Sequence, residues 1–180
     1  MDKTDDCLMF DVLSLMLRTG ILTEPLPGRP TALPALDAVH EGIRKVLGRA
    51  LCIRHVDAGS CNGCELELHA LNNPYYNLEG TGIKFVASPR HADLLLVTGP
   101  VAVNMEFALK RTYDAIPDPK LVIAVGDCGY CGGIFGKSYA TRGSIADVIP
   151  VHHTIPGCPP DPSAVLAGIL HAVLSESRHT

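Results

Sequence analysis

The sequence predicts an α/β fold built around a doubly wound parallel sheet, preceded by an N-terminal helical arm. Two observations carry this prediction. Hydrophobic residues make up 47% of the 180 residues while aromatic residues make up only 5%, so the apolar mass is aliphatic, as in buried parallel strands. Short aliphatic runs also alternate with stretches of helical periodicity, which is the pattern of βα units.

The first predicted element is a helix over residues 6–19, which acidic residues can cap and Gly20 can end. Its polar residues form one narrow stripe, and the rest of its surface is apolar. The proline-rich stretch that follows predicts an extended arm. We therefore assign residues 1–36 to a helix and arm that dock on a partner, and residues 37–180 to the folded domain.

Helices and strands alternate within the predicted domain. Two of the expected strands contain apolar runs, Leu94–Val97 and Leu121–Val125, that are continuous, as in strands covered on both faces. An amphipathic helix comes first, and sites in such sheets form at the carboxyl ends of the strands. The expected strands are residues 50–56, 83–87, 93–98 and 120–125, and the expected helices are residues 37–48, 62–72, 103–116 and 162–176.

Composition argues against several functional classes. The net charge of −4 gives no basic surface for a nucleic acid partner. Seven cysteines are an odd number in a chain without a secretory signal, which disfavours a disulfide framework. In a reducing compartment, free thiols are commonly metal ligands or redox groups. The apolar start of the chain is too short and too often interrupted by polar residues to span a bilayer, so we expect no transmembrane segment.

Four cysteines lie in glycine-bearing segments: Cys61, Cys64, Cys128 and Cys158. The first pair and Cys128 each follow an expected strand, which places them at one edge of the sheet. Thiolates with glycines nearby, where backbone N–H groups can approach the sulfides, are typical of iron–sulfur clusters. Cys128 and Cys131 compete for the same ligand position, and composition alone does not separate them.

Two other kinds of site would use part of the same set. Cys61-x-x-Cys64 and Cys128-x-x-Cys131 are two pairs, as in a structural zinc site, but they are farther apart than in zinc ribbons and leave Cys158 unexplained. A thiol–disulfide pair at Cys61 and Cys64 leaves the remaining cysteines without a role. A zinc-stabilised interaction module is therefore the alternative of a different class.

Six segments together match a known family: Thr23–Pro27, Gly59–Glu65, Ser88–Arg90, Thr98–Pro100, Gly132–Tyr139 and Ile155–Pro160. On these segments the chain resembles the small subunit of membrane-bound, complex I-related nickel–iron hydrogenases of the formate hydrogenlyase type. It also resembles the 20-kDa cluster-carrying subunit of respiratory complex I. Complex I subunits carry two adjacent cysteines at the first position, whereas Asn62 and Gly63 separate the pair here, as in the hydrogenases.

We therefore expect a flavodoxin-like α/β domain. The resemblance implies one [4Fe-4S] cluster held by Cys61, Cys64, Cys128 and Cys158, with Cys131 a departure from the family. It implies an electron relay within an oxidoreductase complex, without catalysis by this chain alone. The alternative within the same superfamily is a complex I-type NADH/quinone oxidoreductase subunit with the cluster next to the quinone site.

The resemblance also implies partners and a location. The partners would be a hydrogenase large subunit, a ferredoxin-like iron–sulfur subunit, and membrane-embedded subunits that the N-terminal arm contacts. The complex would place this chain peripherally on the cytoplasmic side of a membrane.

Two charged residues are expected near the cluster. Arg90 matches a family segment that approaches the cluster, where a cation would favour the reduced form; the alternative is a solvated loop arginine. Glu67 matches an acidic family position and is a candidate for coupling proton movement to electron movement. Its alternative is a carboxylate favoured at a helix start by the helix dipole.

Overall fold

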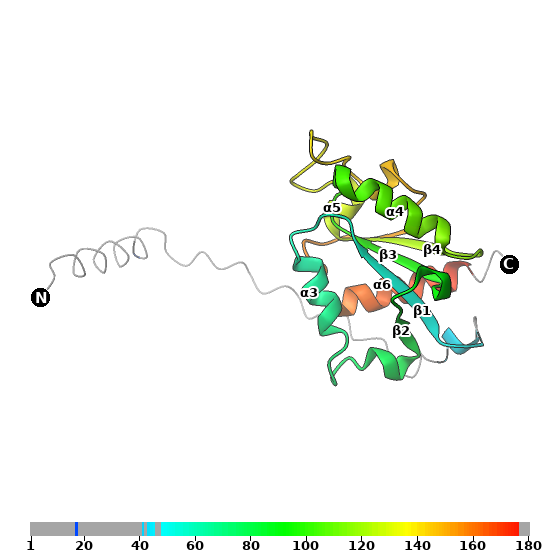
Figure 1. Cartoon of the computed structure of the whole chain (residues 1–180). Coiled ribbons are helices and arrows are strands. Elements are labelled where there is room, and N and C mark those ends of the chain that lie inside the picture. Colours follow the sequence, from blue (N-terminus) through cyan, green and yellow to red (C-terminus); the bar gives the residue numbers. More distant parts are fainter. Residues whose placement is uncertain (1–16, 18–40, 42, 46–47, 177–180) are drawn as a thin grey trace, which may run out of the picture. The chain divides into compact units, whose positions relative to one another are not determined.

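A five-stranded parallel sheet with helices on both faces forms the domain (Figure 1). The structure is a computed structural model and describes residues 17, 41, 43–45 and 48–176. The strand order is β2-β1-β3-β4-β5, and every neighbouring pair is parallel. This is the order of flavodoxin-like doubly wound sheets, so the predicted fold class is confirmed.

Three strands lie where the sequence predicts them: β1 (Leu51–Asp57), β3 (Leu94–Thr98) and β4 (Leu121–Val125). All five residues of β3 are buried, because helices cover both faces of the sheet. β2 (Ile83–Phe85) is shorter than predicted. β5 (His153–Ile155) was not predicted, because three residues carry no periodicity and the strand is defined by its pairing with β4.

The predicted helices α3 (Gly63–Ala70), α4 (Val103–Ala115) and α6 (Pro162–Glu176) are present. A further short helix, α5 (Gly126–Cys131), follows β4 directly and was not predicted. The described single-turn 3-10 helices are η1 (Leu78–Thr81), η2 (Pro89–His91) and η3 (Ile145–Asp147).

The chain divides into two units, residues 1–32 and 33–180. Of the predicted helix over residues 6–19 only Leu17 is described, and it is helical. The rest of that helix, the proline-rich arm and the predicted boundary after residue 36 lie outside the described residues. Residues 41 and 43–45 are helical, as predicted for the start of the domain. Within the described part of the chain, no helix is long and apolar enough to cross a membrane.

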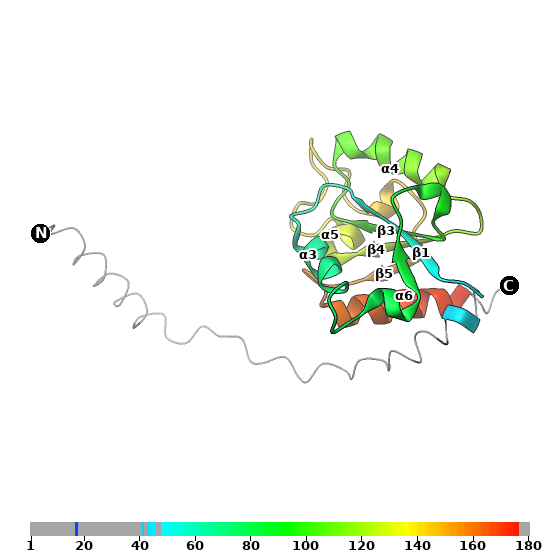
Figure 2. The ribbon, with the colours of Figure 1, turned by 60° about the horizontal axis from the view of Figure 1, so that its bottom comes forward.

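Two hydrophobic clusters cover the two faces of the sheet. Alternate side chains of β3 serve both: Leu94 and Leu96 face the cluster that includes α3 and α6, while Leu95 and Val97 face the cluster that includes α4. Figure 2 shows α6 and α4 on opposite sides of the strands. Each fully buried leucine contributes ~1.5–3 kcal/mol. This packing fixes where the carboxyl ends of the strands lie.

Three of these strand ends lead into cysteine segments. β1 runs into the loop with Cys61 and Cys64, β4 into α5 with Cys128, and β5 into the turn with Cys158. The strand order reverses between β1 and β3, and the carboxyl side of such a switch point is where doubly wound sheets place their sites.

Candidate metal centre

Four cysteines from three chain segments meet at the carboxyl edge of the sheet. Cys64 and Cys128 are each only 9% exposed, whereas Cys61 and Cys158 are exposed. A Cβ atom at Gly126, two residues before Cys128, would lie 2.7 Å from Sγ of Cys64 and 3.4 Å from the carbonyl oxygen of Gly157, the residue before Cys158. The structure therefore brings together the four cysteines that the sequence singled out.

The pKa values of the two buried thiols reflect this crowding. Burial raises the pKa of Cys64 to about 12, and the charge of Glu65 adds to the effect, followed by the other three cysteines. Burial also raises the pKa of Cys128, and the charges of Cys158 and Cys61 add to it. A bound cationic centre reverses this tendency, because it stabilises thiolates and displaces their protons.

Both buried sulfurs lie against glycine backbone. A Cβ atom at Gly126 would lie 2.7 Å from Sγ of Cys64, and one at Gly133 would lie 2.8 Å from Sγ of Cys128. Both glycines also have positive φ values, 82° and 53°, which disfavour other residues. A side chain at either position would displace a sulfur. Bare backbone next to the sulfurs is the surrounding that an iron–sulfur cluster requires, so these residues fit such a group.

Asp127 joins the segments that carry Cys128 and Cys158. Its backbone N–H donates to the carbonyl oxygen of Gly157 at 2.9 Å. The N–H of Gly157 donates in return to Oδ1 of Asp127 at 2.8 Å. Each partner precedes a cysteine, so this reciprocal pair fixes the two cysteines relative to each other.

The loop that carries Cys61 is held by side-chain hydrogen bonds. Oδ1 of Asp57 accepts from the N–H groups of Gly59 at 2.8 Å and Ser60 at 2.7 Å. Oγ of Ser60 accepts from the N–H of Asn62 at 3.0 Å and donates to Oε2 of Glu65 at 2.6 Å. Asn62 itself has a left-handed backbone, with φ 71°. Hydrogen bonds thus hold the loop on both sides of Cys61.

Glu65 is a buried carboxylate that the sequence did not single out. It is 6% exposed and also accepts a hydrogen bond from Oγ1 of Thr98, at the end of β3. The sequence pointed to Glu67 instead. Glu67 is half-buried, and its side chain makes no hydrogen bond within the described part of the chain. The sequence did contain one signal that Glu65 is buried. Glu65 lies about one helical turn before Leu68, so the two share the buried face of α3.

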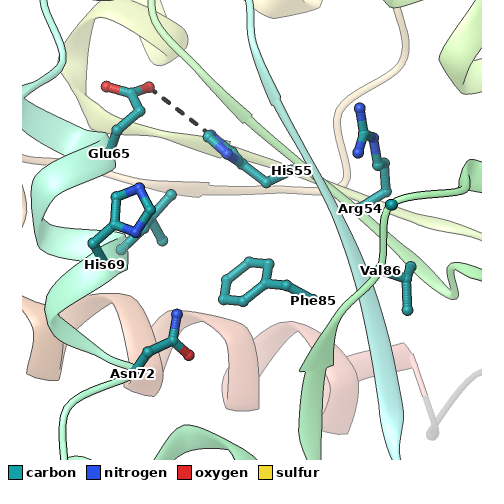
Figure 3. Close-up of a pocket in the computed structure, with 9 residues that line it drawn as sticks. Arg54, His55, Glu65, His69, Asn72, Phe85 and Val86 are labelled. Atoms are coloured by element: carbon teal, nitrogen blue, oxygen red, sulfur yellow. Dashed lines mark ion pairs between the residues drawn. The ribbon is translucent and has the colours of Figure 1, made fainter.

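A pocket of about 330 Å³ lies next to α3 (Figure 3). Glu65 and His55 line it, with Oε1 and Nε2 3.9 Å apart, and His69 and Asn72 add further polar groups. Burial lowers the pKa of His55 although the charge of Glu65 raises it, so the ring is neutral at pH 7. None of the four cysteines lines this pocket, which borders the cysteine site through Glu65.

Arg90 and Cys131 are both exposed. Arg90 lies in η2 and is not among the charges that most affect the pKa of Cys64 or Cys128. Sγ of Cys131 contacts the carbonyl oxygen of Asp127 at 3.3 Å, within its own helix. Cys131 is therefore engaged with α5, whereas the sulfur of Cys128 is buried.

Among the described residues, no group of three or more His, Cys, Asp or Glu side chains surrounds one point closely enough to hold a single metal ion. Each thiolate of a four-cysteine cluster binds a different iron atom, so such a cluster does not require its sulfurs to surround one point.

Comparison with known proteins yields one family and several relatives. Residues 61–172 match the family of the NADH ubiquinone oxidoreductase 20 Kd subunit. The probable membrane-bound hydrogenase subunit mbhJ of Pyrococcus furiosus is 46% identical over 129 residues, which cover 72% of this chain and 77% of that protein. Formate hydrogenlyase subunit 7 of Escherichia coli is 40% identical over 148 residues, which cover 82% of this chain and 58% of that protein.

Solved structures give the same fold. A chain of the membrane-bound sulfane sulfur reductase, described as an archaeal respiratory membrane complex, aligns with a TM-score of 0.61 and 35% identity over 73% of each chain. A chain of an NAD+-reducing [NiFe]-hydrogenase aligns with a TM-score of 0.53 and 18% identity, over 68% of this chain and 92% of that one. At that identity the second likeness supports the fold alone.

Proposed function

Because the chain belongs to the family of the NADH ubiquinone oxidoreductase 20 Kd subunit, we propose that it is the electron-transfer small subunit of a membrane-associated nickel–iron hydrogenase complex. We further propose that Cys61, Cys64, Cys128 and Cys158 hold one [4Fe-4S] cluster. The observation that carries the proposal is the convergence of these four thiols, with glycine backbone against the two buried sulfurs.

The relatives favour the hydrogenase type over the complex I type. Two relatives that are 40% identical or more are subunits of membrane-bound hydrogenase and of formate hydrogenlyase. Asn62 and Gly63 separate the first two cysteines here, as in the hydrogenase small subunits that the chain resembles. These relatives are oxidoreductase subunits, so this chain is a component of an oxidoreductase complex. Quinone chemistry next to the site is the less supported alternative.

The chain's own residues would hold and insulate the cluster. A [4Fe-4S] cluster, when bound, supplies one-electron transfer. Cys64 and Cys128 would supply two largely buried thiolates, while Cys61 and Cys158 would supply two at the exposed rim of the site. All four thiols would give up their protons on binding. We assign the chain a relay role between partners, without catalysis on its own.

Several large exposed apolar side chains in the segment that follows Cys128 support a partner surface near the site. Tyr130, Ile134, Phe135 and Tyr139 are all exposed, with Ile134 91% and Tyr139 99% exposed. They follow Cys128 in α5 and in the loop whose Gly133 contacts the sulfur of Cys128. Exposed apolar surface beside a site commonly marks a protein contact. We assign this surface to the redox partners, a hydrogenase large subunit and a ferredoxin-like iron–sulfur subunit.

The N-terminal arm is proposed to contact membrane-embedded subunits, which would place the chain peripherally on the cytoplasmic side. Arg90 is proposed to raise the reduction potential of the cluster once the complex is assembled, and Glu67 to couple proton movement to electron movement. Neither the Arg90 nor the Glu67 side chain takes part in the hydrogen bonds that hold the cysteine segments. The two proposed roles therefore require partner subunits that bring these side chains into contact with the electron-transfer path.

Iron and acid-labile sulfide analysis of the full chain, purified without oxygen, tests the cluster. We expect about four iron and four sulfide per chain, together with an electron paramagnetic resonance signal after reduction with dithionite. Zinc without sulfide would contradict the proposal and favour the interaction module.

A further inference from the structure

We propose that Glu65 is a positioning residue that fixes the loop between Cys61 and Cys64 and that its charge keeps the reduction potential of the cluster low. This inference rests on the proposed function. It adds a role for a residue that neither the family resemblance nor the sequence pattern selected.

The geometry of Glu65 joins three elements around the loop. Its two carboxylate oxygens accept from Ser60, in the loop itself, and from Thr98, at the end of β3. Nε2 of His55, on β1, lies 3.0 Å from Oγ1 of Thr98. Because Thr98 donates its hydroxyl proton to Glu65, the ring nitrogen of His55 is the donor to Thr98. The carboxylate is thus the acceptor at the end of two hydrogen-bond chains.

One of these chains reaches the backbone between the two cysteines. The N–H of Asn62 donates to Oγ of Ser60, which donates to Glu65. Asn62 has a left-handed backbone, a conformation that costs energy for residues other than glycine. The hydrogen bonds through Ser60 stabilise this conformation, so losing the carboxylate would loosen the loop on which both sulfurs depend.

The charge of Glu65 is placed to act on the site. The side chain is 6% exposed, so solvent screens it weakly. His55 does not neutralise it, because burial lowers the pKa of that ring. Glu65 follows Cys64 directly in α3, so a negative charge on its side chain lies next to the site and opposes added negative charge there. Reduction adds one electron to the cluster, so this field disfavours the reduced form.

Glu67 provides a matched comparison on the same helix. It lies two residues further along α3 and is half-buried, and its side chain makes no hydrogen bond with any described residue. If any acidic charge on α3 lowered the reduction potential, removing either charge would raise the potential. If only the buried, hydrogen-bonded carboxylate lowered it, removing the charge of Glu65 alone would raise it.

The experiment measures the full chain, purified without oxygen, in wild-type, Glu65→Gln and Glu67→Gln forms. The readouts are iron per chain and the ratio of reduced to oxidised cluster at the wild-type midpoint potential, followed by electron paramagnetic resonance. We expect Glu65→Gln to keep its iron, since an amide can still bond both hydroxyls, and to raise the ratio about tenfold. For a one-electron couple, tenfold equals about 59 mV. Glu67→Gln should change the ratio less than about threefold in the isolated chain, because the proton coupling proposed for Glu67 requires the assembled complex.

Two hydroxyl variants separate positioning from charge. Ser60→Ala removes the hydrogen bonds of that hydroxyl to Glu65 and Asn62, and Thr98→Val removes those to Glu65 and His55, but both variants keep the carboxylate. We expect both to lose iron to a chelator faster than wild type while their reduced-to-oxidised ratio stays within about threefold. These variants also carry the positioning test if Glu65→Gln fails to fold.

Three outcomes would overturn the inference. They are an unchanged ratio in Glu65→Gln, an equal shift in Glu67→Gln, and unchanged iron retention in both hydroxyl variants. A wild-type chain without iron and sulfide would instead overturn the proposed function, so the two failures are distinguishable.

Discussion

The two Cys-x-x-Cys segments have the same spacing but opposite arrangements. In Cys61-Asn62-Gly63-Cys64 the second cysteine is buried, and in Cys128-Gly129-Tyr130-Cys131 the first is buried. In the first segment Cys61 lies in the loop before α3 and Cys64 lies within that helix, whereas both cysteines of the second segment lie within α5. Spacing alone therefore does not determine which thiols face the site.

The two segments are also held by different forces. Side-chain hydrogen bonds from Asp57, Ser60 and Glu65 hold the first. The second is held by close backbone contacts at Gly133 and by the pair between Asp127 and Gly157. Because side-chain hydrogen bonds hold one segment and backbone contacts hold the other, a substitution can disturb one segment while the other stays in place. Variants in each segment test this.

The largest expected effect comes from exchanging the cysteines themselves. Cys128→Ser should lose most of the roughly four irons of the proposed cluster, because Cys128 is buried among the other thiols. Cys131→Ser should keep its iron, because that sulfur is exposed and contacts its own helix. Iron and sulfide analysis of both variants checks this. Iron loss in Cys131→Ser alone would reverse the assignment of the second segment.

Adding a methyl group at Gly126 should have the next largest effect. The new Cβ would lie 2.7 Å from the sulfur of Cys64, and overpacking of this kind costs about 1–3 kcal/mol. The left-handed backbone adds about 1–2 kcal/mol. Gly136→Ala is the control, since it has a positive φ but no atom within 4 Å of a Cβ. Urea unfolding of both variants should show Gly126→Ala as clearly the less stable, and equal stabilities would refute the crowding argument.

Removing the Asp127 carboxylate should have a moderate effect. Asp127→Ala loses the hydrogen bond to the N–H of Gly157, and a hydrogen bond to a charged group contributes about 1.5–3 kcal/mol. Because Asp127 is only half-buried, we expect a value near the lower end. Asp127→Asn keeps an acceptor oxygen and should recover most of the stability. Denaturant midpoints of the two variants measure this, and identical losses would mean that the hydrogen bond is unimportant.

The smallest expected effect is a pH dependence at β5, the strand before Cys158. Burial lowers the pKa of His153, and the neighbouring His171 lowers it further; the two ring centroids are 5.0 Å apart. As the pH falls below about 6.5, the unfolded chain binds the proton before the folded chain does. Stability should therefore decrease as the pH falls through this range.

Thermal melting of wild type and His153→Gln at pH 7.5 and 5.5 checks that prediction. The variant should lose less stability between the two pH values than wild type does. His91→Gln, at an exposed position, is the control and should behave like wild type. An identical pH response in all three proteins would show that the His153–His171 pair does not contribute.

The sequence by itself determined the central strands and the family. β3 and β4 contain continuous aliphatic runs that only a sheet covered on both faces accommodates. The cysteines could be singled out because each lies in a glycine-bearing segment and three of them follow an expected strand. Residues 61–172 carry enough of the family's pattern to identify it.

Only the tertiary structure decided the shorter elements and the supporting residues. β5 is a strand because β4 pairs with it, and three residues have no periodicity of their own. The sequence places Glu65 and Glu67 at the start of one helix, and the family resemblance favours Glu67. Their difference arises because Ser60 and Thr98 approach one of them from separate segments, and contacts between distant segments are set by packing rather than by local pattern.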